Sequence, residues 1–143
     1  MLTAQRVAKY MVKYSNSINK PLSNLKLQKL LYFAWIENYK RNKEYLFDED
    51  FYAWQFGPVV PVVYYEYCAY GGLPIIQYSQ NNNDDVLEDE DIIKSVVERY
   101  KDISALQMVK MTHESGHAWD HVYRNGAGYR CRISFTEIIR YEC

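Results

Sequence analysis

A cluster of histidines in the last third of the sequence has the spacing of a zinc site. His113, Glu114 and His117 satisfy the pattern His-Glu-x-x-His, and His121 follows four residues later. On a continuous helix, residues i and i+4 share a face, so the two imidazoles could hold Zn²⁺ while the glutamate activates a water molecule. The pattern therefore raises the hypothesis of a metal-dependent hydrolase that uses His113, Glu114 and His117.

The residues inside this pattern argue against a helix that could carry such a site. Ser115 and Gly116 stand between the two histidines. A glycine in a helix costs about 1 kcal/mol relative to alanine, and the flanking predicted helices are short. We therefore expect a turn beside a buried Trp119, with no catalytic residue, no metal ligand and no cofactor.

Other sequence patterns that carry catalysis are missing from the chain. It has no phosphate-binding G-x-x-x-x-G-K-[ST] loop, no G-x-G-x-x-G after a predicted strand and no G-x-S-x-G elbow. Cys68, Cys131 and Cys143 form no C-x-x-C pair, so they indicate neither a disulfide framework nor a zinc ribbon. With no signal-peptide pattern and no apolar run of membrane-spanning length, we expect a cytoplasmic protein that is not an enzyme and does not contact a membrane.

The charges of the chain are nearly balanced but unevenly distributed. The net charge of −1 argues against nucleic acid as a partner, because nucleic-acid binders neutralise many phosphates. Residues 1–43 carry nine Lys or Arg and one acid, whereas residues 44–143 carry eight Lys or Arg and seventeen acids. Such a chain either steers a charged partner toward one face or neutralises itself within the folded molecule, and the second outcome is the more common.

Aromatic residues are the clearest outlier of the composition. The chain has 15 Tyr, 3 Trp and 5 Phe, together 16% of its residues. So many phenols are hard to bury with every hydroxyl hydrogen-bonded, and exposed Tyr and Trp rings concentrate at binding hot spots. Two interpretations remain open: an ordinary core with amphipathic surface tyrosines, and a protein-binding face. For the second, the best candidates on the two most aromatic predicted helices are Trp35, Tyr39, Tyr64, Tyr65 and Tyr67.

Hydrophobic periodicity and turn residues place these side chains on a mostly helical scaffold. Apolar spacings of three and four residues predict helices, aromatic-rich short runs predict strands, and a polar, acidic segment predicts a loop. The predicted helices span residues 3–14, 25–41, 59–70, 92–100, 106–111, 117–123 and 134–141, the strands 51–56 and 129–134, and the loop 77–91. We therefore expect a mainly α, α+β fold, a single compact helical domain over residues 1–143 with a few short strands.

Four features of these elements can be predicted in more detail. Ser23 and Ser134 are expected to cap the helices that follow them. Gly57 should be needed for a positive φ or a close backbone approach, and Pro58 should lie in the first turn of the next helix. Trp54 and Phe56 are expected on the preceding strand. The centre of the core should contain the narrow apolar stripe of the longest helix, formed by Leu27, Leu30, Leu31 and Ala34.

Two longer blocks of sequence resemble a known family. The first is Leu25–Ala34 (LKLQKLLYFA), and the second is Phe51–Pro61 (FYAWQFGPVVP). Thr112-His113-Glu114, with Trp119 downstream, is a third match. Together they resemble the Panacea domain, the family of SocA-like antitoxins and GepA-like phage-associated proteins. The motif residues that this resemblance singles out are Leu27, Gln28, Lys29, Leu30, Tyr32, Trp54, Phe56, Gly57, Pro58 and Trp119.

The resemblance has consequences for both fold and function. It implies a mostly helical domain with a few short strands. It also implies an antitoxin of a toxin–antitoxin or phage-defence operon that neutralises a cognate protein toxin, encoded nearby, by direct contact. Members of the family pair with unrelated toxins, and at least one acts as a protease adaptor, so the resemblance implies a cytoplasmic protease as a second partner. The family is not known for metallopeptidases, which weakens the hydrolase hypothesis.

Overall fold

The structure is a computed structural model, and it describes residues 1–77 and 89–143. Most of the predicted loop 77–91 therefore lies outside the described residues. The fold is mainly helical with a small sheet, which confirms the predicted α+β class. In chain order the elements are α1 (Ala4–Ser17), α2 (Asn24–Asn42), β1 (Phe51–Trp54), β2 (Gly57–Val59), α3 (Pro61–Tyr67), the 3₁₀ turn η1 (Cys68–Tyr70), α4 (Glu90–Tyr100), α5 (Ala105–Thr112), α6 (Ala118–Tyr123), the 3₁₀ turn η2 (Arg124–Gly126), β3 (Arg132–Ile133) and α7 (Phe135–Glu142).

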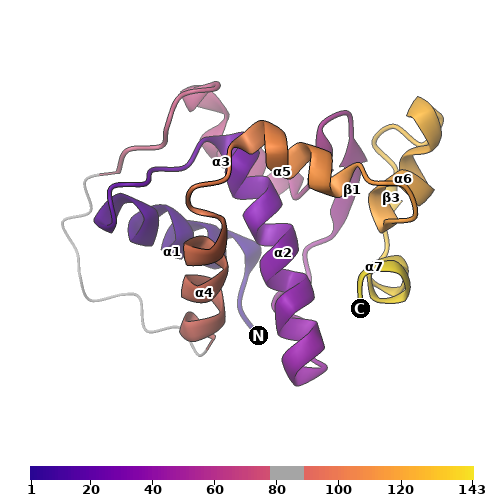
Figure 1. The fold of residues 1–143 in the computed structure, drawn as a ribbon, viewed down its shortest axis with the longest axis horizontal. Coiled ribbons are helices and arrows are strands. Elements are labelled where there is room, and N and C mark those ends of the chain that lie inside the picture. The colour runs from indigo at the N-terminus through magenta and orange to yellow at the C-terminus, as the bar shows by residue number, and fades with distance from the viewer. Residues whose placement is uncertain (78–88) are drawn as a thin grey trace.

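Helix α2 is the central element of the molecule. Figure 1 shows it running through the middle, with α1 and α4 on one side and the sheet, α6 and α7 on the other. A helix surrounded in this way must be apolar on several faces, as the broad stripe of the sequence predicts. The predicted central core is confirmed, since no side-chain surface remains exposed on Leu27, Leu30, Leu31 and Ala34.

Serine side chains begin several of the helices. Ser23 Oγ accepts a hydrogen bond from the backbone N–H of Lys26 at 3.2 Å, and Ser134 Oγ accepts one from Glu137 at 3.2 Å. Each bond satisfies a backbone donor that the first helical turn leaves without a partner inside the helix. Both predicted caps are therefore confirmed.

Strand β1 lies between β2 and β3 and pairs with both in antiparallel orientation. Phe51 faces Ile133 on β3, so the predicted pairing of the segments 51–56 and 129–134 is confirmed. On the other side Trp54 faces Gly57 on β2, which makes the hairpin turn very tight. This hairpin was not predicted, and Phe56, which was expected on the strand, lies in the turn between β1 and β2.

The position of Pro58 differs from the sequence prediction. It lies in β2 rather than in a helix, and α3 begins three residues later at Pro61. β2 is an edge strand, so the missing N–H of Pro58 removes no bond from the centre of the sheet. Pro61 takes the first-turn position of α3, where its missing N–H is harmless. The prediction chose the wrong one of two nearby prolines as the start of the helix.

Gly57 meets both conditions that the sequence predicted for it. Its φ is +112°, a region that side-chain-bearing residues rarely adopt. A Cβ atom at this position would also lie 2.7 Å from Thr112 Oγ1 and 2.8 Å from Lys29 Cε. The absence of a side chain at Gly57 therefore lets the hairpin pack directly against α2 and α5.

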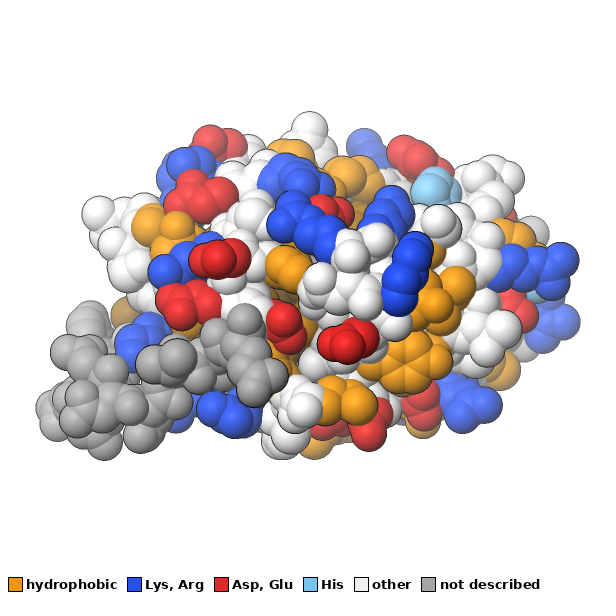
Figure 2. Space-filling view, turned by 90° about the horizontal axis from the view of Figure 1, so that it is seen from below, with side chains coloured by type: hydrophobic (Ala, Val, Ile, Leu, Met, Phe, Trp, Pro, Cys, Tyr) orange, Lys and Arg blue, Asp and Glu red, His pale blue; other side chains and the backbone are white. Residues whose placement is uncertain are grey.

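Polar contacts join the basic first part of the chain to the acidic second part around α1 and α4. Tyr10 on α1 donates a hydrogen bond to Glu90 on α4 at 2.6 Å, and Lys20 pairs with Asp102 at 2.9 Å. Figure 2 shows positive and negative side chains interspersed on the lower face of the molecule. Lys20 and Asp102 thus form an ion pair between the basic and the acidic part of the chain, and charges of both signs lie on this face. In the part of the chain described, no helix has the length and apolar character needed to cross a bilayer.

Candidate functional site

The histidine pattern does not lie on one helix. His113 is the C-terminal cap of α5, and His117 is the N-terminal cap of α6. Gly116 between them has a φ of +89°, which ends the helical path. The premise of the zinc hypothesis, that both imidazoles share one helical face, is therefore wrong for this fold.

The three imidazoles have different neighbours. The His113 ring stacks on Trp119 with centroids 3.8 Å apart, and the His121 ring lies 4.7 Å from the ring of Tyr141. His117 Nδ1 lies 2.8 Å from a carboxylate oxygen of Glu142. Within residues 1–77 and 89–143, no group of three or more His, Cys, Asp or Glu side chains is arranged to hold a metal ion.

Glu142 gives the His117 contact a structural explanation. Its Oε1 atom accepts hydrogen bonds from the backbone N–H of Ala118 at 2.9 Å and from the hydroxyl of Tyr32 at 3.1 Å. The carboxylate thus links the end of α7 to the start of α6 and to α2. The hydrogen bond to Glu142 raises the pKa of His117, while burial, followed by the nearby Glu142 charge, raises the pKa of Tyr32.

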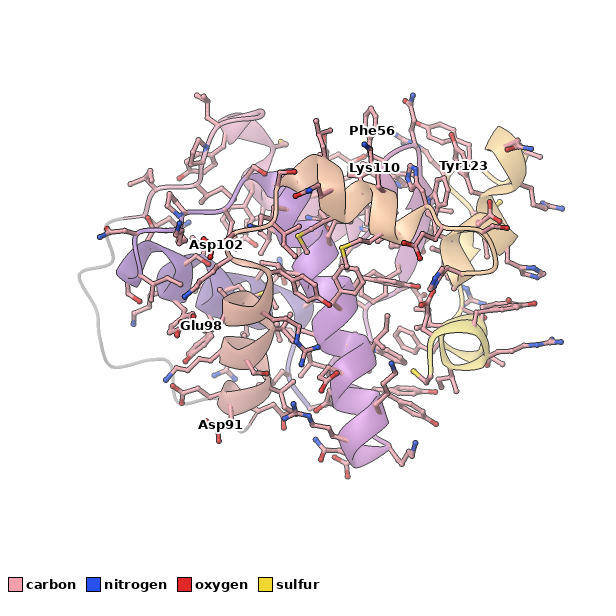
Figure 3. The ribbon with its side chains drawn as sticks, in the orientation of Figure 1. Phe56, Asp91, Glu98, Asp102, Lys110 and Tyr123 are labelled. Atoms are coloured by element: carbon pink, nitrogen blue, oxygen red, sulfur yellow. The ribbon has the colours of Figure 1, made fainter. Side chains whose placement is uncertain are left out.

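A hollow lies on another side of the molecule, at the turn between β1 and β2. This cavity of about 320 Å³ is called the aromatic pocket here. It is lined by residues of the hairpin, α2, α3 and the turn before β3, among them Trp54, Phe56, Tyr64, Tyr129 and Arg130. Phe56 lies at the upper edge of the molecule in Figure 3, on the opposite side from Asp91 of α4.

Aromatic rings from three separate segments surround this pocket. The Trp54 ring lies 4.9 Å from that of Tyr64 and 6.1 Å from that of Tyr65, in edge-to-face arrangements. Phe56 is 53% exposed, Tyr65 56% and Tyr129 51%. A cluster of solvent-exposed aromatic rings is unusual on a protein surface and typical of binding sites.

Two buried amides fix the floor of the pocket. Gln28 Nε2 donates to Asn24 Oδ1 at 3.0 Å, and Gln28 Oε1 accepts from the backbone N–H of Val60 at 2.9 Å. Asn24 Nδ2 in turn donates to the carbonyl of Tyr64 at 3.1 Å. These bonds hold the start of α2 against α3. The pocket is therefore built on a rigid base.

A tight turn places Arg130 over the Trp54 ring. Its backbone N–H donates to the carbonyl of Ala53 at 2.7 Å, and the guanidinium carbon lies 4.7 Å from the Trp54 centroid. Gly128 makes the turn possible, because a Cβ atom there would lie 1.8 Å from the carbonyl oxygen of Val122. The arginine is thus stacked on one wall of the pocket through a cation–π contact.

Comparison with known proteins identifies the family. The model of the family described as "Antitoxin SocA-like, Panacea domain" matches residues 27–120. A curated protein named Antitoxin SocA, from Caulobacter vibrioides (strain NA1000 / CB15N), is 37% identical over 138 residues, which cover 87% of this chain and 72% of that protein. This chain belongs to the SocA-like antitoxin family with a Panacea domain. No solved structure matches it significantly.

The two main Panacea motif blocks interlock in the structure. Gln28 of the first block binds the backbone of Val60 in the second, and Lys29 Nζ donates to the carbonyl of Pro58 at 3.1 Å. Leu27, Leu30 and Tyr32 are buried in the core. Trp119 is also buried, and its Nε1 donates to the carbonyl of Trp54 at 2.8 Å. Most of these motif residues hold the hairpin in place, while Trp54 and Phe56 also line the pocket.

Five residues of the Panacea domain were predicted from the sequence to bind a partner, and the structure separates them. Tyr64 lines the aromatic pocket, and the exposed ring of Tyr65 lies beside it. Tyr39 is half-buried near the other end of α2, where it stacks on Trp35. The remaining two candidates, Trp35 and Tyr67, are not surface residues.

Trp35 and Tyr67 belong to the core, which corrects their expected place on a binding face. Trp35 is fully buried because Phe135 of α7 lies 4.7 Å from its ring, and its Nε1 donates to the carbonyl of Phe47 at 3.1 Å. Tyr67 is 2% exposed, and burial raises its pKa to about 12. Phe47 and α7 cover the side of α2 that carries Trp35. No local pattern in the sequence shows which side of α2 they will cover.

Sequence reasoning missed Tyr129 and Arg130, which line one side of the pocket. Both were assigned to a strand over 129–134, whereas β3 is limited to Arg132–Ile133. The preceding Gly-Ala-Gly turn was the available signal, since a Tyr-Arg pair directly after a tight turn stands on an exposed bend. Both residues also lie beyond the segment 27–120 that the family model matches.

Proposed function

We propose that this protein is an antitoxin that neutralises a cognate protein toxin by binding it directly, and that the aromatic pocket is the centre of the binding surface. Its similarity to the protein named Antitoxin SocA supports the antitoxin role. We further propose that residues 1–143 act as one Panacea domain and that the toxin is encoded by a neighbouring gene.

One observation carries the location of the surface. Phe56, Tyr65 and Tyr129 come from different segments and are each more than half exposed. Phe56 and Tyr129 line one cavity, and Tyr65 lies beside it, against the Trp54 ring. Exposed rings of this kind lose little side-chain entropy on binding and bury a large area, so they dominate the energetics of protein interfaces. These exposed rings are not part of the buried core, so packing of the core does not explain their position.

A binding role without catalysis agrees with the geometry of the histidine region. His113, His117 and His121 have separate structural neighbours, and the helix that the hydrolase alternative requires is broken at Gly116. The zinc content of the purified protein separates the two functions. An antitoxin of this kind should retain no stoichiometric zinc, whereas a hydrolase built on His113, Glu114 and His117 should retain one ion per chain.

The decisive test is co-expression with the toxic product of the neighbouring gene. Tyr65→Ala should lose growth rescue and bind the toxin about 30-fold more weakly, as expected for truncation of a hot-spot ring. Its melting temperature should stay close to that of the wild type, because the ring is 56% exposed. Tyr45→Ala is the matched control, since that ring is 41% exposed and lies against Trp35 and Tyr39, away from the pocket.

The result that would contradict the proposal is equally specific. If Tyr65→Ala, Phe56→Ala and Tyr129→Ala each rescue growth and bind the toxin as the wild type does, the binding surface lies elsewhere. The half-life of the toxin in the same cells shows whether a protease is a second partner. A direct inhibitor leaves the half-life unchanged, whereas a protease adaptor shortens it.

A further inference from the structure

We infer that the aromatic pocket recognises a short segment of the partner protein in which an apolar side chain stands next to an acidic one. The apolar side chain enters between the rings of Trp54, Phe56 and Tyr64, and the carboxylate binds the guanidinium group of Arg130. This inference rests on the proposed function, because it specifies which chemistry of the toxin the pocket accepts.

The charge inside the pocket favours an acidic group. Arg130 is the charged residue among the side chains that line it, and the others are aromatic, aliphatic, glycine or amide residues. The amides of Asn24 and Gln28 are already hydrogen-bonded within the protein. An anion that enters the pocket therefore meets one cation and no competing carboxylate in its lining.

The guanidinium of Arg130 interacts with the hydroxyls of Tyr129 and Tyr65, which a carboxylate would replace. The group lies 4.7 Å above the Trp54 ring, and its Nε donates to the hydroxyl of Tyr129 at 3.3 Å. Stacking occupies the face of the guanidinium, while a carboxylate binds along its edge through the terminal nitrogens. A carboxylate forms a stronger hydrogen bond to arginine than the neutral tyrosine hydroxyl does, so the partner would complete the site.

The backbone presents Arg130 in a fixed position. The carbonyl of Ala53 accepts its N–H at 2.7 Å, and the carbonyl of Cys131 accepts the N–H of Ala53 at 2.8 Å. Arg130 has a φ of +65°, a conformation held by these two bonds to Ala53 of β1. Because the turn is already ordered, little entropy is lost when a ligand binds, which strengthens association.

The size of the cavity limits what it can accept. About 320 Å³ lies at the lower end of the range for ligand pockets, roughly 300–1,000 Å³. This volume suits one anchoring side chain with its neighbour rather than a large cofactor. The occupant we infer, an apolar residue beside an aspartate or glutamate, matches both the volume and the charge.

A single-stranded nucleic acid would also bring a flat base and an anion, but the surroundings favour a protein. Nucleic-acid grooves follow the backbone with several cations in a row. Here Arg132, two residues after Arg130, lies 3.7 Å from Asp50 and is partly neutralised by it. The lining of the pocket therefore offers a single cation, which suits one carboxylate rather than a row of phosphates.

The test is a double-mutant cycle with the toxin. Arg130→Gln should weaken toxin binding about 10- to 100-fold, which corresponds to one charge-assisted hydrogen-bonded contact. One Asp→Asn or Glu→Gln substitution in the toxin should cause a similar loss alone and almost no further loss when combined with Arg130→Gln. Arg140→Gln is the matched control, because that exposed arginine also stacks on a tyrosine, at 5.5 Å, but outside the pocket lining.

Three outcomes would overturn the inference. If Arg130→Gln binds the toxin with wild-type affinity, the guanidinium has no role in binding. If the loss from Arg130→Gln adds to the loss from each acidic-residue substitution in the toxin, Arg130 binds no carboxylate of the toxin. Tight binding of a ten-nucleotide oligothymidylate that is lost in Arg130→Gln and competes with the toxin would replace the peptide by nucleic acid. If Tyr65→Ala still weakens toxin binding in the first two cases, the proposed function stands and only this inference fails.

Discussion

Lys29 is a fully buried lysine that joins the two Panacea motif blocks. Its Nζ donates to the carbonyl of Pro58 at 3.1 Å, and its Cε lies against Gly57. Burial lowers the pKa of Lys29 to about 7, far below its ordinary value of 10.5. The folded protein therefore holds the proton less tightly than the unfolded chain does, and the charged ammonium group destabilises the fold at low pH.

This shift gives a signed prediction for Lys29→Met. Between pH 7 and about 10.5 the unfolded wild type keeps the proton while the folded protein releases it, so its unfolding free energy rises with pH. Met cannot titrate, so the stability advantage of the variant should shrink on the order of 1 kcal/mol per pH unit across this window. Urea unfolding of both proteins at pH 7, 8 and 9 measures it. If the difference in unfolding free energy between the two proteins does not change with pH, the pKa of Lys29 is not lowered in the folded protein.

Periodicity and caps predicted the helical elements because they are local signals. Ser23 and Ser134 start helices where the sequence placed them, and the apolar stripe of α2 is buried as predicted. The predictions that were wrong concern features that depend on contacts between residues distant in the sequence. β2 forms because Gly57 fits against Lys29 and Thr112, and Trp35 is buried because α7 covers it.

The aromatic pocket was predictable only in part for the same reason. Tyr64 and Tyr65 stood out as surplus rings on a short helix, and both lie at the pocket or beside it. Tyr129 and Arg130 reach it through a turn whose backbone is hydrogen-bonded to β1, a pairing that no local pattern specifies. Likewise, the histidine pattern fitted a helix in spacing, but Gly116 divides it between two helices.

The central position of α2 can be tested with Leu30→Ala. This side chain has no exposed surface, so its truncation removes buried apolar contacts and leaves a cavity. The substitution should lower the unfolding free energy by about 2–5 kcal/mol. Leu106→Ala is the control, because Leu106 is 68% exposed and should change stability by less than about 0.5 kcal/mol. An unchanged denaturation midpoint for Leu30→Ala would contradict the architecture.

On the scale of the whole molecule, the contacts that hold the scaffold together lie apart from the exposed rings of the proposed binding surface. Arg99 of α4 pairs with Glu37 of α2, and the segments after α1 and α4 pair through Lys20 and Asp102. Asp91 of α4 lies at the opposite edge from Phe56 (Figure 3). The motif blocks meet behind the hairpin through Gln28 and Lys29 and hold it rigid. What remains on the hairpin side is a group of exposed rings with one arginine, the composition expected of an interface centre.

Hydroxyl-radical footprinting of the protein with and without the co-purified toxin tests this account most directly, because it reports the exposure of individual aromatic side chains. Phe56, Tyr65 and Tyr129 are oxidised readily in the free protein if they are exposed as the structure describes. The account predicts that oxidation of all three falls several-fold in the complex, while that of exposed Tyr45 at the other end of α2 does not change. Unchanged oxidation of these three rings, with protection of Tyr45 or of α1 instead, would contradict it.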